Sequence, residues 1–163
     1  MNAAHMHLVL NHFPIVGVVF AIPLLLLGWL LRRDDFSRAG LLLVVLAGIL
    51  TIPAFLTGES AEDVVERLPK VSAAVIERHE EAAKVALGLM GATAILGAIG
   101  LVAGFMKKNV LRVLVPLTLL ACLVSTVALA WTNNLGGQIQ HSEIRTNGTP
   151  GQAPSGNVRE HDD

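Results

Sequence analysis

The sequence predicts an all-α membrane protein, folded as one up-down bundle of four transmembrane helices. The chain of 163 residues is 53% hydrophobic and only 15% charged, whereas about a quarter of an ordinary soluble domain is charged. Its apolar residues fall in four runs of about 20, the length that a helix needs to cross a bilayer. Strands of a membrane barrel would be about ten residues long and would alternate apolar with polar side chains. We therefore expect a single transmembrane domain over residues 1–145.

The four runs predict spans over residues 12–31, 39–57, 85–106 and 112–131. The two short loops that join spans one to two and three to four carry a cluster of basic residues: Arg32, Arg33, Arg38, Lys107, Lys108 and Arg112. Cytoplasmic loops are enriched in Lys and Arg, so we expect these loops inside and both termini outside. In a bacterium, the protein would lie in the cytoplasmic (inner) membrane with its histidines on the periplasmic side.

The outer segment between spans two and three, residues 60–84, is also predicted to be helical. Ser60 followed by Asp63 resembles a capping box, and the apolar residues after it share one helix face. We expect a short amphipathic helix on the outer membrane surface that ends at Pro69. A second helix is expected to start at Ser72 and to continue into span three, because no proline occurs before Pro116.

The C-terminal residues 146–163 read TNGTPGQAPSGNVREHDD. Gly, Pro, Ser and Asn dominate this stretch and its apolar residues show no periodicity. Such a segment cannot bury enough apolar surface to offset the entropy of ordering. We expect a disordered polar tail.

Histidines are the main candidates for function. The predicted topology places all six on the outer side: His5, His7, His12, His79, His141 and His161. His12 lies at the mouth of span one, behind Asn11 as a plausible helix cap, and His79 lies on the packed face above span three. Ionisable groups at such positions are costly and mark functional sites. Imidazole is the commonest protein ligand for metal ions and also binds haem iron.

The first hypothesis is a haem-b-binding electron-transfer or accessory subunit. His12 and His79 would be the axial ligands, because they lie on helices nearest the lipid boundary, with His7 and His141 as second choices. Lys84 or Arg145 could pair with the haem propionates. Small residues of the third helix could leave a flat slot for the porphyrin: Ala82, Ala83, Ala86, Gly88 and Gly91.

Two other hypotheses remain open. One copper or zinc ion could be bound by His5, His7, His12, His79 and His141, together with Glu80 or Glu143. The His-Met-His run at positions 5–7 offers two imidazoles and a thioether, which suits copper. Alternatively, the chain is a structural accessory subunit of a larger membrane complex without a cofactor, and its histidines hydrogen-bond helix ends.

Catalysis by the chain alone is not indicated. The hydroxyl residues have no GxSxG context, Cys122 lies in the middle of a span, and no phosphate-binding loop is present. We expect the lipid bilayer and other membrane or periplasmic subunits as partners, and no nucleic acid, because the formal net charge is −1.

Three motifs resemble a bacterial family of predicted four-span membrane proteins of unknown function. They are HLVLNHFPI from His7 to Ile15, the loop TGESAEDVVERLP followed by His79-Glu80-Glu81, and GGQIQHSEIR from Gly136 to Arg145. The resemblance covers residues from about 5 to 145. It implies that His7, His12, His79 and His141 belong to the family's motifs, which favours a ligand role for them without choosing between haem and a metal ion.

Overall fold

The computed structural model describes residues 3–65, 73–106 and 108–141, and this part of the chain contains helices and no strand. The helices are α1 (Ala3–Leu10), α2 (His12–Leu30), α3 (Asp34–Val65), α4 (Ala73–Met106) and α5 (Lys108–Gln140). Four candidate membrane spans are long and apolar enough to cross a bilayer: Ala3–Leu30, Asp34–Val65, Ala73–Met106 and Asn109–Ile139. Each overlaps one predicted span, and only Leu31 of the predicted residues falls outside them, so the prediction of an all-α membrane bundle is confirmed.

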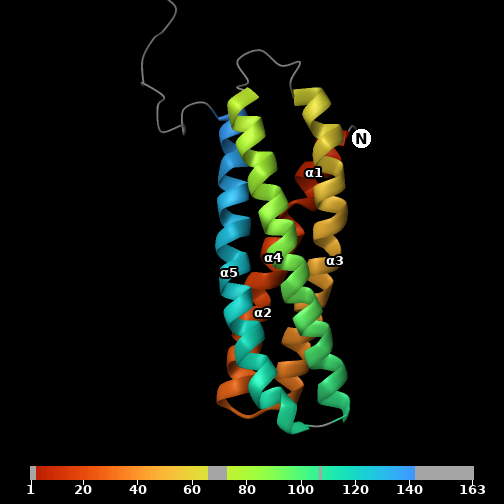
Figure 1. Cartoon of the computed structure of the whole chain (residues 1–163), viewed down its shortest axis with the longest axis vertical. Helices are drawn as coiled ribbons and strands as arrows, with labels where there is room; N and C mark the ends of the chain where they lie inside the picture. The colour runs from red at the N-terminus through yellow and green to blue at the C-terminus, as the bar shows by residue number, and fades with distance from the viewer. Residues whose placement is uncertain (1–2, 66–72, 107, 142–163) are drawn as a thin grey trace, which may run out of the picture.

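Helices α1 and α2 run in the same direction, and from α2 to α5 the helices run alternately up and down (Figure 1). The N-terminal helix α1, the C-terminal ends of α3 and α5 and the start of α4 share one end of the bundle, which we call the cavity end. The link between α2 and α3 and the adjoining ends of α4 and α5 lie at the opposite end. We call this the basic end, because Arg32, Arg33, Arg38 and Arg112 lie in or beside these segments. The predicted tail, residues 146–163, lies outside the described residues.

The break between α1 and α2 follows from Pro14. A proline ring inside a helix clashes with the carbonyl four residues earlier, here that of Leu10, and α1 ends at Leu10. Asn11 does not cap α2 as expected. Its backbone is itself helical, with φ −64° and ψ −20°, and its side chain makes no capping hydrogen bond. The eight residues of α1 pack mainly on α3.

The segment after span two differs from the expectation. Helix α3 continues through Gly58 and Ser60 to Val65, so the residues expected to begin a separate surface helix form its last turns. One glycine inside a helix costs only about 1 kcal/mol, which does not stop a helix whose neighbours are well packed. The expected end at Pro69 lies outside the described residues. Helix α4 runs unbroken from Ala73 to Met106, as predicted.

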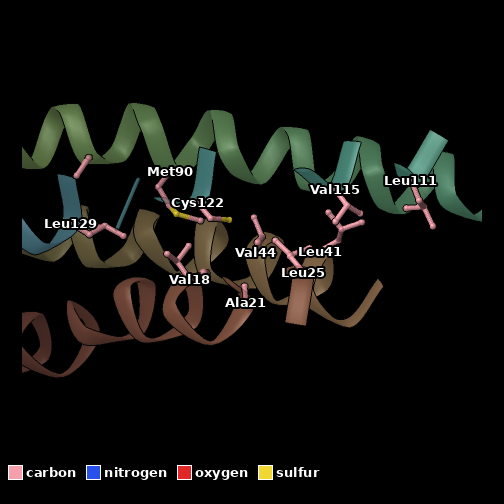
Figure 2. Close-up of a cluster of buried hydrophobic side chains, with 12 residues drawn as sticks. Val18, Ala21, Leu25, Leu41, Val44, Met90, Leu111, Val115, Cys122 and Leu129 are labelled. Carbon is pink, nitrogen blue, oxygen red and sulfur yellow. The ribbon is translucent and has the colours of Figure 1, made fainter. Parts of the chain in front are cut away.

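Small residues let the helices approach closely. A Cβ added at Gly17 would lie 2.9 Å from the Cβ of Ala47, and one added at Gly48 would overlap the Cβ of Ala94. Helices associate in membranes through close packing and hydrogen bonds rather than through the hydrophobic effect, and small residues allow the backbones to approach. A row of buried side chains fills the space between the helices, and Met90 and Cys122 belong to it (Figure 2). Many large apolar side chains point outward, including Phe105, which is 73% exposed, as expected of a lipid-facing surface.

One buried polar contact joins α4 to α5. The hydroxyl groups of Thr93 and Ser125 lie 2.9 Å apart, and Thr93 also donates to the carbonyl of Leu89. Both side chains are buried between the helices. The pair links the two helices on which the site at the cavity end depends.

Candidate functional site

A cavity of about 370 Å³ opens at the cavity end of the bundle. All five helices contribute to its walls. Its apolar lining includes Leu8, Phe55, Ile76 and Ile139, and its polar lining includes Asn11, Asn133, Glu59, Glu62, Glu80 and the four histidines His7, His12, His79 and His141. The four histidines that the sequence predicted as cofactor ligands therefore line one cavity.

His7 projects from α1 onto α3. Its Nδ1 lies 2.9 Å from the carbonyl oxygen of Ala54 and 3.4 Å from Oγ1 of Thr57. The ring is half-buried, and this burial lowers the pKa of His7 below 6.5, while the hydrogen bond to Ala54 works in the opposite direction. The residue lies beyond the predicted span of residues 12–31, so it is neutral in an aqueous environment near pH 7.

His79 is held in the same way by α5. Its Nδ1 lies 2.9 Å from the carbonyl oxygen of Thr132. Burial lowers the pKa of His79, the hydrogen bond to Thr132 raises it, and the charge of a protonated His7 lowers it further. His79 lies above the predicted span of residues 85–106, and it too is neutral near pH 7.

His7 and His79 form a pair. Their ring centroids are 6.3 Å apart and their planes are perpendicular, at 87°. Only an N–H can donate to a carbonyl oxygen, so each neutral ring carries its proton on Nδ1 and a lone pair on Nε2. Within the described part of the chain neither Nε2 has a hydrogen-bond partner. Metal-binding histidines almost always donate their second ring nitrogen to a carbonyl or carboxylate, and both imidazoles have this arrangement.

The sequence predicts a pairing of His12 with His79, and in the structure the ring beside His79 is that of His7. His12 is exposed, and its Nδ1 bonds to the carbonyl of Leu8 in the preceding turn at 2.9 Å. His141 is also exposed. His5 is exposed and is not among the residues that line the cavity.

The remaining predicted residues are placed as follows. Glu80 lines the cavity and forms an ion pair with Lys84, whose Nζ lies 2.7 Å from Oε1. Lys84 is therefore already engaged. Glu143 and Arg145 lie outside the described residues. Among residues 3–65, 73–106 and 108–141, no three His, Cys, Asp or Glu side chains are grouped closely enough to hold an ion.

The sequence predicts a slot for the porphyrin along the small residues of the third predicted span, but the cavity lies elsewhere. Of its five small residues only Ala83 lines the cavity. Ala86 is buried in the core, and Gly88 and Gly91 have no atom within 4 Å of a built Cβ, so they face outward. Helical rotation, which the sequence alone does not define, puts these glycines on the lipid side.

Two glycines and one amide at the site were not anticipated as site residues. Gly58 and Gly136 lie beside the rings of His7 and His79, respectively. Oδ1 of Asn11 is buried and has no hydrogen-bond partner within the described residues. Each glycine follows, by four residues, the residue whose carbonyl accepts the hydrogen bond from the histidine. This spacing could have indicated the two glycines as site residues, but it is visible only once the histidines are placed.

The sequence matches the family described as Predicted membrane protein (DUF2231) over residues 3–144. The chain belongs to the DUF2231 family. The match covers the four candidate spans and His7, His12, His79 and His141, which confirms the resemblance noted from the motifs. Comparisons of this DUF2231 protein with curated proteins and with solved structures gave no significant match.

Proposed function

We propose that the protein is a membrane haem b protein that carries electrons, and that His7 and His79 would hold the haem iron. The haem would sit in the cavity between α1 and the pair formed by α4 and α5. Bound haem supplies one-electron chemistry, because its iron cycles between the ferric and ferrous states. The chain supplies the two ligands, their hydrogen-bonded carbonyls and an apolar enclosure.

The spacing of the His7–His79 pair is the observation that carries the proposal. A metal–imidazole bond of about 2.0 Å puts the ring centroid roughly 3 Å from the metal. Two imidazoles on opposite sides of one iron would therefore have centroids about 6 Å apart, and the separation in the structure is 6.3 Å. The two Nδ1–H groups are already bound to carbonyl oxygens, which leaves Nε2 of each ring for the iron.

The size and lining of the cavity favour haem over a single metal ion. Its volume of about 370 Å³ falls in the range of pockets for organic ligands, roughly 300–1,000 Å³. One water molecule, comparable in size to an ion, takes only about 30 Å³. Leu8, Phe55 and Ile76 offer the apolar contacts that a porphyrin requires. Copper or zinc remains the second candidate, because four histidines line the same cavity.

The proposed location follows from charge. Basic loops stay on the cytoplasmic side, and the described arginines of the two links lie at the basic end. The cavity end would then face the periplasm of a bacterial inner membrane. Electrons would pass to or from other membrane or periplasmic protein subunits that approach this end.

The cofactor content of the protein purified in detergent from its native membranes tests the proposal. We expect a pyridine haemochrome assay to find close to one b-type haem per chain, and elemental analysis to find iron at the same ratio. If about one copper or zinc ion per chain is found and no haem, the result would favour the second candidate, a metal-binding membrane protein. A protein with neither, which copurifies with a larger complex, would instead be a structural accessory subunit.

A further inference from the structure

We infer that α3 and α5 each carry a receptor for an imidazole, made of a main-chain carbonyl and a glycine one helical turn later, and that Gly136 is the residue that positions His79. The effect on the cofactor rests on the proposed function. The effect on the histidine itself does not, and it is measured on the protein without haem.

The two histidines are bound in matching ways. His7 donates to the carbonyl of Ala54, four residues before Gly58, and His79 donates to the carbonyl of Thr132, four residues before Gly136. In both cases the ring atom closest to the missing Cβ is Cε1, followed by Nδ1. Each imidazole therefore approaches its helix with the same edge and at the same place relative to the glycine.

Helix geometry explains the spacing of four residues. Each Cα–Cβ bond tilts toward the helix N-terminus, so the side chain of residue i+4 leans over the carbonyl of residue i. A side chain at position 58 or 136 would lie beside the donor that now reaches this carbonyl. Glycine leaves the second lone pair of the oxygen open, while the first still accepts the helical N–H.

The two receptors are not equally tolerant. A Cβ at position 136 would lie 3.1 Å from Cε1 and 3.4 Å from Nδ1 of His79. At position 58 the corresponding distances to His7 are 3.5 and 3.8 Å. Carbon atoms in favourable contact are about 3.5–4.0 Å apart, so a methyl group fits beside His7 and crowds His79. Gly136→Ala must move the His79 ring by a few tenths of an ångström, away from the carbonyl of Thr132.

This displacement loosens the bond that fixes the tautomer of His79. With Nδ1–H held by Thr132, the lone pair stays on Nε2. When the bond lengthens, the ring gains access to the Nε2–H tautomer, which cannot bind a metal through Nε2. Gly136 is thus a positioning residue, which acts on a cofactor only through His79.

The test is nitrogen NMR of ¹⁵N-histidine-labelled, haem-free protein in detergent, with four chains compared. We expect the wild type to hold His79 in the Nδ1–H form and Gly136→Ala to shift it to a mixture of both tautomers. Gly58→Ala should change His7 less than Gly136→Ala changes His79. Gly88→Ala is the matched control, because Gly88 lies in α4 with no atom within 4 Å of its Cβ. Alanine is the better helix former, so these variants should fold.

An unchanged His79 tautomer in Gly136→Ala, or an equal change in Gly88→Ala, would overturn the inference. Titration with haem separates it from the proposed function. If haem binds, Gly136→Ala should weaken its affinity by about 10- to 100-fold, the usual effect of disturbing a residue that orients a metal ligand. If no chain binds haem but the tautomer shift is found, the proposed function fails and the positioning role of Gly136 stands.

Discussion

The ring centroids of His7 and His79 lie 6.3 Å apart and their planes are perpendicular, although the helices that carry them do not pack on one another within the described chain. Each ring is held instead by a neighbouring helix, His7 by α3 through Ala54 and His79 by α5 through Thr132. The spacing of the pair is therefore a property of the whole bundle. A ligand that joins the two rings would join the α1–α3 side to the α4–α5 side.

The first prediction concerns the choice of ligands. His7→Ala and His79→Ala should each lose the bound haem, because each removes one axial nitrogen. His12→Ala should keep it, since the His12 ring is exposed and its Nδ1 bonds to the carbonyl of Leu8 in the preceding turn. Haem content per chain checks this, with elution volume from a sizing column as the control for folding. Loss of haem from His12→Ala together with retention in His7→Ala would favour the pair expected from sequence.

The second prediction concerns the electronic state of the iron. Axial imidazoles with perpendicular planes leave two iron orbitals nearly equal in energy, whereas parallel planes separate them. The angle of 87° therefore predicts a strongly anisotropic low-spin ferric signal with one large g value. Low-temperature electron paramagnetic resonance measures this signal. An ordinary rhombic spectrum would contradict the ring orientation found here.

The third prediction is a loss of stability in acid. Burial lowers the pKa of both His7 and His79, whereas in the unfolded chain they titrate near their ordinary value of about 6.5. As pH falls through 6.5 the unfolded state takes up protons first, so stability decreases and levels off below the lowered folded pKa values. Above pH 7 these two groups should contribute no pH dependence.

Thermal unfolding of the haem-free protein between pH 8 and pH 5 measures this effect. The double variant His7→Gln, His79→Gln should show a smaller decrease than the wild type. The cavity carboxylates Glu59, Glu62 and Glu80 are the same in both proteins, so the difference between the two decreases measures the contribution of the histidines. An identical decrease in both proteins would assign the acid sensitivity to other groups.

The fourth prediction concerns packing between α3 and α4. Gly48→Ala should destabilise the protein by about 1–3 kcal/mol, because the new methyl group overlaps Ala94 and the helices must separate. Gly88→Ala makes the same chemical change at an outward-facing position and should be neutral or stabilising. Denaturant titration in detergent, followed by helical circular dichroism, compares them. Equal stability of the two variants would mean that α3 and α4 do not meet at Gly48.

The fifth prediction concerns orientation. In a Cys122→Ala background, Asp63→Cys at the cavity end should react with a membrane-impermeant maleimide added to intact cells. Arg33→Cys at the basic end should react only after the cells are opened. Both native side chains are exposed, so access to the reagent depends on the membrane. The opposite pattern would place the site on the cytoplasmic side.

Hydropathy predicts the four spans because the bilayer dictates their length. Helix α1 was not predicted from the sequence, although Pro14 accounts for its end at Leu10. The expectation of a separate helix starting at Ser60 was wrong, because capping signals do not end a helix that is already packed on its neighbours. In the structure α3 instead continues to Val65.

The sequence could bring the histidines to one end of the bundle, but it could not pair them. His7 and His12 are five residues apart, and which one faces His79 depends on the break at Asn11 and on the rotation of α1. The same rotation decides that Gly58 and Gly136 face the site while Gly88 and Gly91 face outward. Packing between helices determines these orientations, and the order of residues along one helix does not reveal how that helix is rotated.

The most direct measurement is a dithionite-reduced minus oxidised visible spectrum of the protein purified from native membranes, recorded beside His7→Ala and His12→Ala. We predict sharp alpha and Soret bands of a low-spin b-type haem in the wild type and in His12→Ala, and their loss in His7→Ala. A featureless wild-type spectrum, or an unchanged spectrum in His7→Ala, would contradict haem ligation by the His7–His79 pair.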